Sequence, residues 1–132
     1  LPMKLDECVT GIHMAQRIVA DRGAENCCLK ISNLGGLSKA RRVRDYLVDN
    51  RIAVVSEDSW GGEITTVAVA HFAASTPEDW LVNTTDLMNY NTRSTGIGGP
   101  TSAGGKLYPG DAPGLGVEPD FDSLGAAVRV YS

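Results

Sequence analysis

The sequence has 132 residues, of which 42% are hydrophobic and 21% are charged, values typical of one globular domain with an apolar core. The formal net charge of -4 argues against a basic surface for nucleic acid, and no apolar run approaches the length that crosses a bilayer, so we expect neither nucleic-acid nor membrane partners. The three cysteines, two of them adjacent, do not suit a disulfide framework and predict reduced, buried thiols in a cytoplasmic protein.

The chain opens with a short predicted strand and an amphipathic helix. Residues 1–6 read as a strand, with Pro2 near its start, where a missing backbone N–H is tolerated. Thr10 is placed to cap a helix that ends at about Arg22, because apolar residues recur there at helical spacing and Gly23 is a natural stop. The pattern therefore predicts a first strand-and-helix unit.

The next two units repeat this pattern. Residues 27–32 form a second predicted strand, and a pair of glycines turns the chain into a helix over 37–48. The continuous apolar run 52–55 is typical of a strand buried on both faces, and a helix over 63–75 follows it. Three arginines of the second helix fall away from its apolar face and are expected in solvent: Arg41, Arg42 and Arg44.

A fourth strand and a loop-rich tail complete the chain. Residues 80–86 form the fourth predicted strand, while glycines crowd into 96–116 and indicate loops. A last strand is predicted within 126–131. We therefore divide the chain into a region of alternating strands and helices over 1–90 and a Gly-rich loop and tail over 91–132.

The alternation of strands and helices predicts the α/β class. Four βα-type units imply parallel strands joined by right-handed crossovers. A complete (β/α)8 barrel needs about 200 residues or more, so four strands fit either a small open sheet or half of a barrel. The element pattern by itself leaves these two architectures open.

All four predicted strands finish in polar residues. The carboxyl ends of parallel strands share one rim, where active sites of α/β proteins lie, so these side chains are expected to meet. Carboxylates beside one lysine favour a Mg²⁺ site next to an amine whose pKa is lowered by the cation. The residues at the strand ends are Asp6 and Glu7, Lys30, Glu57 and Asp58, and Asp86.

Five segments that span nearly the whole chain carry a family resemblance. They are Pro2–Glu7 (PMKLDE), Leu29–Leu37 (LKISNLGGL), Glu57–Gly62 (EDSWGG), Thr85–Leu87 (TDL) and Pro113–Val117 (PGLGV). In this order they resemble the mandelate racemase/muconate lactonizing enzyme branch of the enolase superfamily, and most of all its proline betaine epimerases and hydroxyproline dehydratases. The resemblance implies the C-terminal half of a TIM-like (β/α)7β barrel. It also implies a Mg²⁺-dependent racemase, epimerase or dehydratase that abstracts a proton α to a carboxylate.

The resemblance also implies roles for individual residues. Asp6 takes the place of the third metal-binding carboxylate, and Lys30 that of the lysine that acts as acid or base. Asp58, Trp60 and Asp86 are implied to bind the substrate, a small carboxylate or amino-acid-derived molecule, although plain packing under its loop is an equal alternative for Trp60. Dipeptide epimerases of the branch carry two acids where this chain has only Asp86, which argues against dipeptide substrates.

The resemblance further implies groups that this chain does not supply. The capping domain, the first four barrel strands, the first two metal carboxylates and the partner lysine pair after the second strand have no counterpart in the sequence, so we expect the chain alone to be catalytically inactive. Its expected partner is then the N-terminal half of the same enzyme. The alternative is a non-catalytic half-barrel module that assembles as a homo-oligomer through its open edges. A small open α/β binding protein outside the superfamily is a third possibility.

Overall fold

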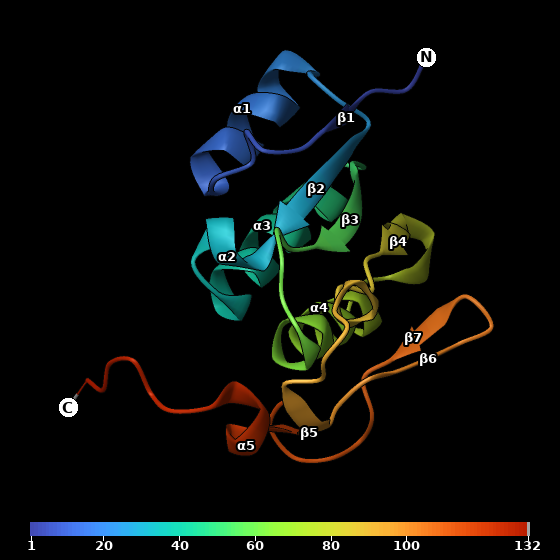
Figure 1. The fold of residues 1–132 in the computed structure, drawn as a ribbon. Helices are drawn as coiled ribbons and strands as arrows, with labels where there is room; N and C mark the ends of the chain where they lie inside the picture. Colours follow the sequence, from blue (N-terminus) through green and yellow to red (C-terminus); the bar gives the residue numbers. More distant parts are fainter. Residues whose placement is uncertain (132) are drawn as a thin grey trace.

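Four parallel strands form the central sheet (Figure 1): β1 (Lys4–Leu5), β2 (Asn26–Lys30), β3 (Ala53–Glu57) and β4 (Leu81–Thr84). The structure is a computed structural model that describes residues 1–131. The strand order is β1-β2-β3-β4, and each strand pairs in parallel with the next one along the chain. The predicted α/β class with four parallel strands is therefore confirmed, in the sequential order that a barrel wall requires.

Three long helices form the crossovers between the strands: α1 (Ile12–Asp21), α3 (Leu37–Asp49) and α4 (Glu63–Ala74). The helices α1 and α3 each bury one face, whereas α4 is apolar nearly all round because it lies between the sheet and the C-terminal tail. Leu29 and Leu47 are completely buried in the core between strands and helices, and each such side chain contributes roughly 1.5–3 kcal/mol.

Successive residues of each strand serve opposite faces of the sheet. Cys27, Leu29 and Val54 belong to the apolar core under the helices. Cys28 and Lys30 alternate with them and contact the carboxylate of Glu57 on the other face. Because side chains alternate between the two faces of a strand, one face of the sheet belongs to the apolar core and the other carries polar groups.

The element boundaries depart from the prediction at two places. Thr10 does not cap α1: Gly11 is the N-cap residue, and no side chain in the described part of the protein closes that end with a hydrogen bond. The second strand ends at Lys30 rather than at residue 32, because the next residues form the short helix α2 (Ile31–Leu34). The glycines that follow α2 have φ angles of +79° and +110°, which only glycine adopts without strain, so the predicted turn is confirmed.

Arg44 is buried, which corrects its expected place in solvent. Its side chain is only 6% exposed, and its guanidinium donates to Asp45 and, at 2.7 Å, to the hydroxyl of Ser75 beyond the end of α4. It also lies 5.3 Å from the ring centre of Phe72 in α4. The helix pattern placed Arg44 outside the apolar face of α3, but the packing of α3 against α4 covers that side as well.

The remaining elements are short, and most of them belong to the tail. They are the 3₁₀ turns η1 (Glu78–Trp80) and η2 (Met88–Tyr90), the strands β5 (Gly96–Gly98), β6 (Thr101–Ala103), β7 (Lys106–Tyr108) and β8 (Val117–Pro119), and the helix α5 (Phe121–Leu124). In the tail, β5 pairs with β8 and β6 pairs with β7, both antiparallel. The division at residue 90 stays a prediction.

The strand predicted within 126–131 is wrong. Those residues form no strand, and the chain after α5 extends away from the rest of the molecule in Figure 1. The side chains of Val128 and Val130 are exposed, so within the described chain no neighbouring strand offers them a partner.

No helix in residues 1–131 is both long and apolar enough to cross a membrane. The cytoplasmic location stays a prediction.

Candidate functional site

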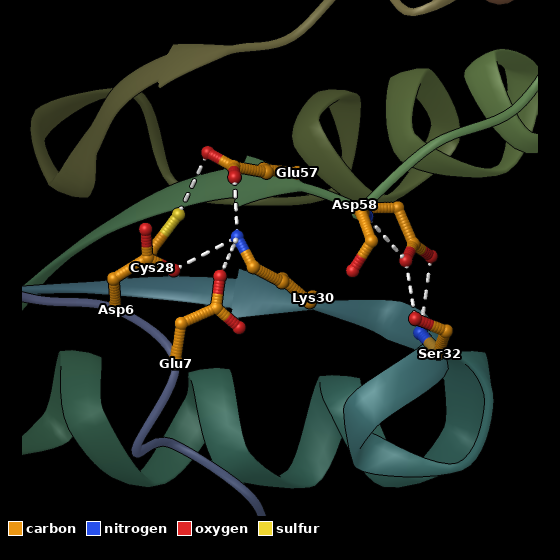
Figure 2. A network of polar contacts seen from close by, with 8 residues as sticks. Asp6, Glu7, Cys28, Lys30, Ser32, Glu57 and Asp58 are labelled. Carbon is orange, nitrogen blue, oxygen red and sulfur yellow. Dashed lines mark hydrogen bonds and ion pairs between the residues drawn. The ribbon is translucent and has the colours of Figure 1, made fainter.

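Lys30 ends β2 and lies at the centre of a cluster of carboxylates at the rim of the sheet (Figure 2). Its ammonium Nζ is 2.5 Å from Glu57 Oε1, 2.8 Å from Asp6 Oδ1 and 3.4 Å from Glu7 Oε1. Asp6 and Glu7 follow β1, and Glu57 ends β3, so three parallel strands deliver these groups to one place. The rim predicted from the strand ends thus exists for these residues.

Cys28 is a member of the cluster that the sequence did not identify. Its thiol donates to Glu57 Oε2 at 2.8 Å, while Glu57 Oε1 accepts from Lys30. The adjacent cysteines were interpreted only as small buried hydrophobes. The signal that could have found Cys28 is its spacing, because a residue two before Lys30 on the same strand lies on the same face.

The pKa of the Lys30 ammonium is raised above its ordinary value. Burial by itself would lower this pKa, but the contacts with Asp6 and Glu57 outweigh burial because they stabilise the charged form. The lowered pKa that we expected beside a cation is therefore not what the carboxylates alone produce. Burial, and then the hydrogen bond to Glu57, raises the pKa of the Cys28 thiol.

The donor atoms of the cluster fit a hard cation in part. Asp6, Cys28 and Glu57 each offer one ligand atom, and these atoms all lie within 4.8 Å of one another. Asp6 Oδ1 is buried and, although it is close to the ammonium, receives no well-directed hydrogen bond from any described residue. Carboxylate oxygens are the ligands that Mg²⁺ prefers, whereas a protonated thiol is not, so Asp6 and Glu57 fit and Cys28 does not.

Asp58 lies at the same rim but faces another group. Its carboxylate accepts from the backbone N–H of Ser32 at 3.0 Å, from the Ser32 hydroxyl and from the backbone N–H of Ser59 at 2.8 Å (Figure 2). It is 7% exposed. These three bonds direct Asp58 toward the first turn of α2 and away from the Lys30 ammonium, so its predicted contact with substrate stays a prediction.

Trp60 and Asp86 lie on the loops beyond β3 and β4. Trp60 is exposed and packs edge-on against Tyr90, with ring centres 6.2 Å apart. Asp86 Oδ2 accepts from the Asn89 amide at 2.5 Å, and its buried Oδ1 has no hydrogen-bond partner within the described chain. Asp86 and Tyr90 line a cavity of about 450 Å³ that also reaches Glu57. Their roles toward a substrate stay predictions.

The comparisons with known proteins agree on one family. Residues 1–123 match the family described as "Enolase C-terminal domain-like". The chain is 41% identical to cis-3-hydroxy-L-proline dehydratase of Roseibium aggregatum over 132 residues, which is all of this chain and 36% of that protein. It is 30% identical to muconate cycloisomerase 1 of Rhodococcus opacus, over 94% of this chain and 33% of that protein.

Solved structures give the same result. A mandelate racemase/muconate lactonizing enzyme from Roseovarius nubinhibens ISM is 79% identical, with a TM-score of 0.94 over 97% of this chain and 35% of that one. An enolase superfamily member from the same organism, solved in complex with magnesium, is 32% identical, with a TM-score of 0.93 over 98% of this chain and 36% of that one. The chain thus spans about a third of the length of these relatives. It belongs to the enolase superfamily, as a C-terminal domain of the mandelate racemase/muconate lactonizing enzyme type.

Proposed function

We propose that this chain is part of a Mg²⁺-dependent enzyme that abstracts a proton α to a carboxylate, as a racemase, epimerase or dehydratase. The observation that carries the proposal is the position of the Lys30 ammonium, 2.8 Å from Asp6 and at the end of a parallel strand. Membership of the enolase superfamily and the magnesium complex of a relative support it.

In this proposal Lys30 transfers the proton and Asp6 holds the metal. Asp6 would hold a divalent cation, which when bound would supply positive charge that attracts a substrate carboxylate to the rim and disfavours the protonated form of the Lys30 amine. Glu57, on the neighbouring strand β3, orients the amine of Lys30 through a contact of 2.5 Å. Lys30 then takes or returns a proton at the α-carbon, depending on its own protonation state.

Asp86 and Trp60 form the substrate side of the proposed site. Asp86 offers a buried carboxylate oxygen that has no hydrogen-bond partner among residues 1–131 and lies beside the cavity, which suits a substrate nitrogen that carries positive charge. The exposed face of Trp60 can attract the same nitrogen by cation–π contact. Together with the similarity to cis-3-hydroxy-L-proline dehydratase, these groups favour a cyclic amino acid or its betaine as the first substrate to test.

The chain alone is expected to be inactive. Because Glu57 is engaged with Lys30, Asp6 is the only carboxylate among the described residues that is assigned to the metal, and a single carboxylate holds Mg²⁺ weakly. Two-base epimerisation also needs an acid or base on each face of the α-carbon, and among the described residues only Lys30 is assigned to this task. The proposed partner is the N-terminal half of the same enzyme.

Proton exchange into D₂O tests the proposal. The chain is mixed with the N-terminal half and Mg²⁺, and loss of the α-proton signal of cis-3-hydroxy-L-proline, L-proline and L-proline betaine is followed by NMR. We expect exchange only in the mixture, and we expect Lys30→Ala or removal of Mg²⁺ to abolish it. A folded complex of the two halves that exchanges no proton in any of these compounds would contradict the proposal.

A second candidate function is a non-catalytic assembly module. The observation that favours it is that β1 and β4 are the edges of the sheet, each paired on one side only among the described residues. Parallel strand edges of this kind can pair with a second copy of the chain. Its test belongs to the whole molecule and is given in the Discussion.

A further inference from the structure

Asp58 is a buried carboxylate whose hydrogen bonds within the described chain come from the backbone and hydroxyl of Ser32 and from the backbone of Ser59. It accepts from the Ser32 backbone at 3.0 Å, from the Ser32 hydroxyl and from the Ser59 backbone at 2.8 Å. The side chain makes no ion pair within the described chain. A buried charge that relies on three donors strongly favours the one arrangement that supplies all of them.

The place where Asp58 binds is immediately beyond Lys30. Lys30 is the N-cap residue of α2, and Ser32 is the second residue of that helix. The carboxylate of Asp58 therefore fixes the first turn of α2 against the end of β3. Because α2 begins directly after Lys30, this contact also fixes the backbone from which the lysine side chain projects.

Glu57, the last residue of β3, and Asp58, the residue after it, hold Lys30 in different ways. Glu57 contacts the ammonium at 2.5 Å, and Asp58 contacts the backbone two residues later (Figure 2). Neighbouring side chains of an extended segment point to opposite sides. Glu57 can therefore contact the Lys30 ammonium while Asp58 contacts the backbone that follows Lys30.

We propose that Asp58 is a positioning residue, which keeps Lys30 in the geometry for proton transfer by fixing the first turn of α2. This inference rests on the proposed function of Lys30. It assigns Asp58 to the lysine rather than to the substrate, and it therefore predicts an effect on turnover and not on substrate binding.

Asp58→Asn in the protein that contains both halves tests the inference by kinetics. Asparagine keeps the shape but has one acceptor oxygen for three donors. We expect kcat for α-proton exchange to fall by roughly 10- to 100-fold, since small misplacement of a reacting group costs about this much. KM should stay within about twofold, because the inference gives Asp58 no contact with the substrate, so the variant should not change substrate binding. The matched control is Asp79→Asn, an exposed carboxylate in η1, which should leave both constants unchanged.

Chemical labelling gives a readout that does not depend on activity. Lys30 is 5% exposed, so an amine-reactive reagent should label it slowly in the wild-type protein. Mass spectrometry should show faster labelling of Lys30 in Asp58→Asn, because the lysine is held less firmly. If the wild type exchanges no proton but the variant labels faster, the proposed function fails while the contact between Asp58 and the lysine backbone stands.

The inference is overturned if Asp58→Asn labels at the wild-type rate, or if the variant raises KM with kcat unchanged. If Asp58→Asn does not fold, the Ser32→Ala variant tests the inference by the same two measurements. This variant removes only the hydroxyl donor of an exposed residue and should change both readouts in the same direction by a smaller factor. Wild-type kcat and labelling in a folded Ser32→Ala protein would overturn the inference.

Discussion

Glu63 is a buried carboxylate that joins α4 to the tail, and its charge should contribute to stability. Its Oε2 accepts from both the backbone N–H and the hydroxyl of Thr95, at 3.0 Å each. Burial alone would raise the pKa of Glu63, but hydrogen bonds from the backbone of Thr95, from its own backbone N–H and from the hydroxyls of Ser94 and Thr95 lower it from the ordinary value of 4.5. The folded state therefore favours the charged form.

The lowered pKa predicts the pH dependence of a Glu63→Gln variant. A lowered pKa in the folded state gives stability that is complete above the unfolded pKa near 4.5 and is lost as the pH falls through the lower folded value. Glu63→Gln should therefore unfold more easily by about 1–3 kcal/mol at pH 7, and the difference should shrink below pH 4.5. Urea titrations at pH 7 and at a pH below 4.5 measure the free energy of unfolding, with the exposed Glu78→Gln variant as control. An equal loss of stability at the two pH values would exclude the charge as the cause.

The three cysteines should differ in reactivity. Cys8 is exposed, which corrects its expected burial, whereas Cys27 and Cys28 are buried as predicted. Burial, and to a smaller extent the nearby Cys8, raises the pKa of Cys27 to about 11, so its thiol is protonated at pH 8 and cannot act as a nucleophile. Dithionitrobenzoate at pH 8 should modify one thiol quickly and the other two only in denaturant. Cys8→Ser should abolish the fast phase, and a fast phase that survives this change would contradict the assignment.

Among the elements, α3 and α4 are joined through Arg44. Its guanidinium bonds to Ser75 at 2.7 Å and lies over Phe72. Arg44→Met keeps an apolar stem but loses these bonds, so the free energy of unfolding should fall by about 1–3 kcal/mol. Arg42→Met, on the exposed side of the same helix, should change it by less than about 0.5 kcal/mol. Thermal or urea unfolding of the two variants distinguishes a structural arginine from a solvated one, and equal effects would show that Arg44 has no special role.

At the scale of the whole molecule, the open edges of the sheet predict association. β1 and β4 lie at the two ends of the strand order, and Val82 on β4 is 52% exposed. Sedimentation velocity at micromolar concentration should show self-association of the chain alone, which Val82→Lys should weaken because a charged edge strand resists pairing.

The two candidate functions differ in what the N-terminal half does to this association. Under the enzyme proposal, adding that half should replace the self-associated species with a complex of one copy of each. Under the assembly-module alternative, self-association should persist. A clean monomer of the chain alone would refute the assembly module and leave the enzyme proposal to the exchange experiment.

The amino-acid sequence by itself determined the class of the fold and the rim of the site. Continuous apolar runs and helical spacing are local signals, so they located four strands and three long helices to within a few residues. Parallel strands place their carboxyl ends together, so Asp6, Lys30 and Glu57 could be expected at one rim before any distance was known. Five motifs in chain order, among them those around Lys30 and Trp60, indicated the family that the match over residues 1–123 confirms.

Only the tertiary structure decided what each polar group contacts. Asp58 and Glu57 are neighbours in the sequence, yet one binds Ser32 and the other Lys30, because the register of β2 and β3 pairs Glu57 with Lys30 and the next side chain points to the opposite side. Arg44 is buried because α4 packs against its side of α3, and the segment 126–131 forms no strand because no other strand of the described chain lies beside it. Local periodicity predicts neither outcome, because both depend on which other element packs there. Local sequence specifies which face a side chain takes, and long-range packing specifies what it meets there.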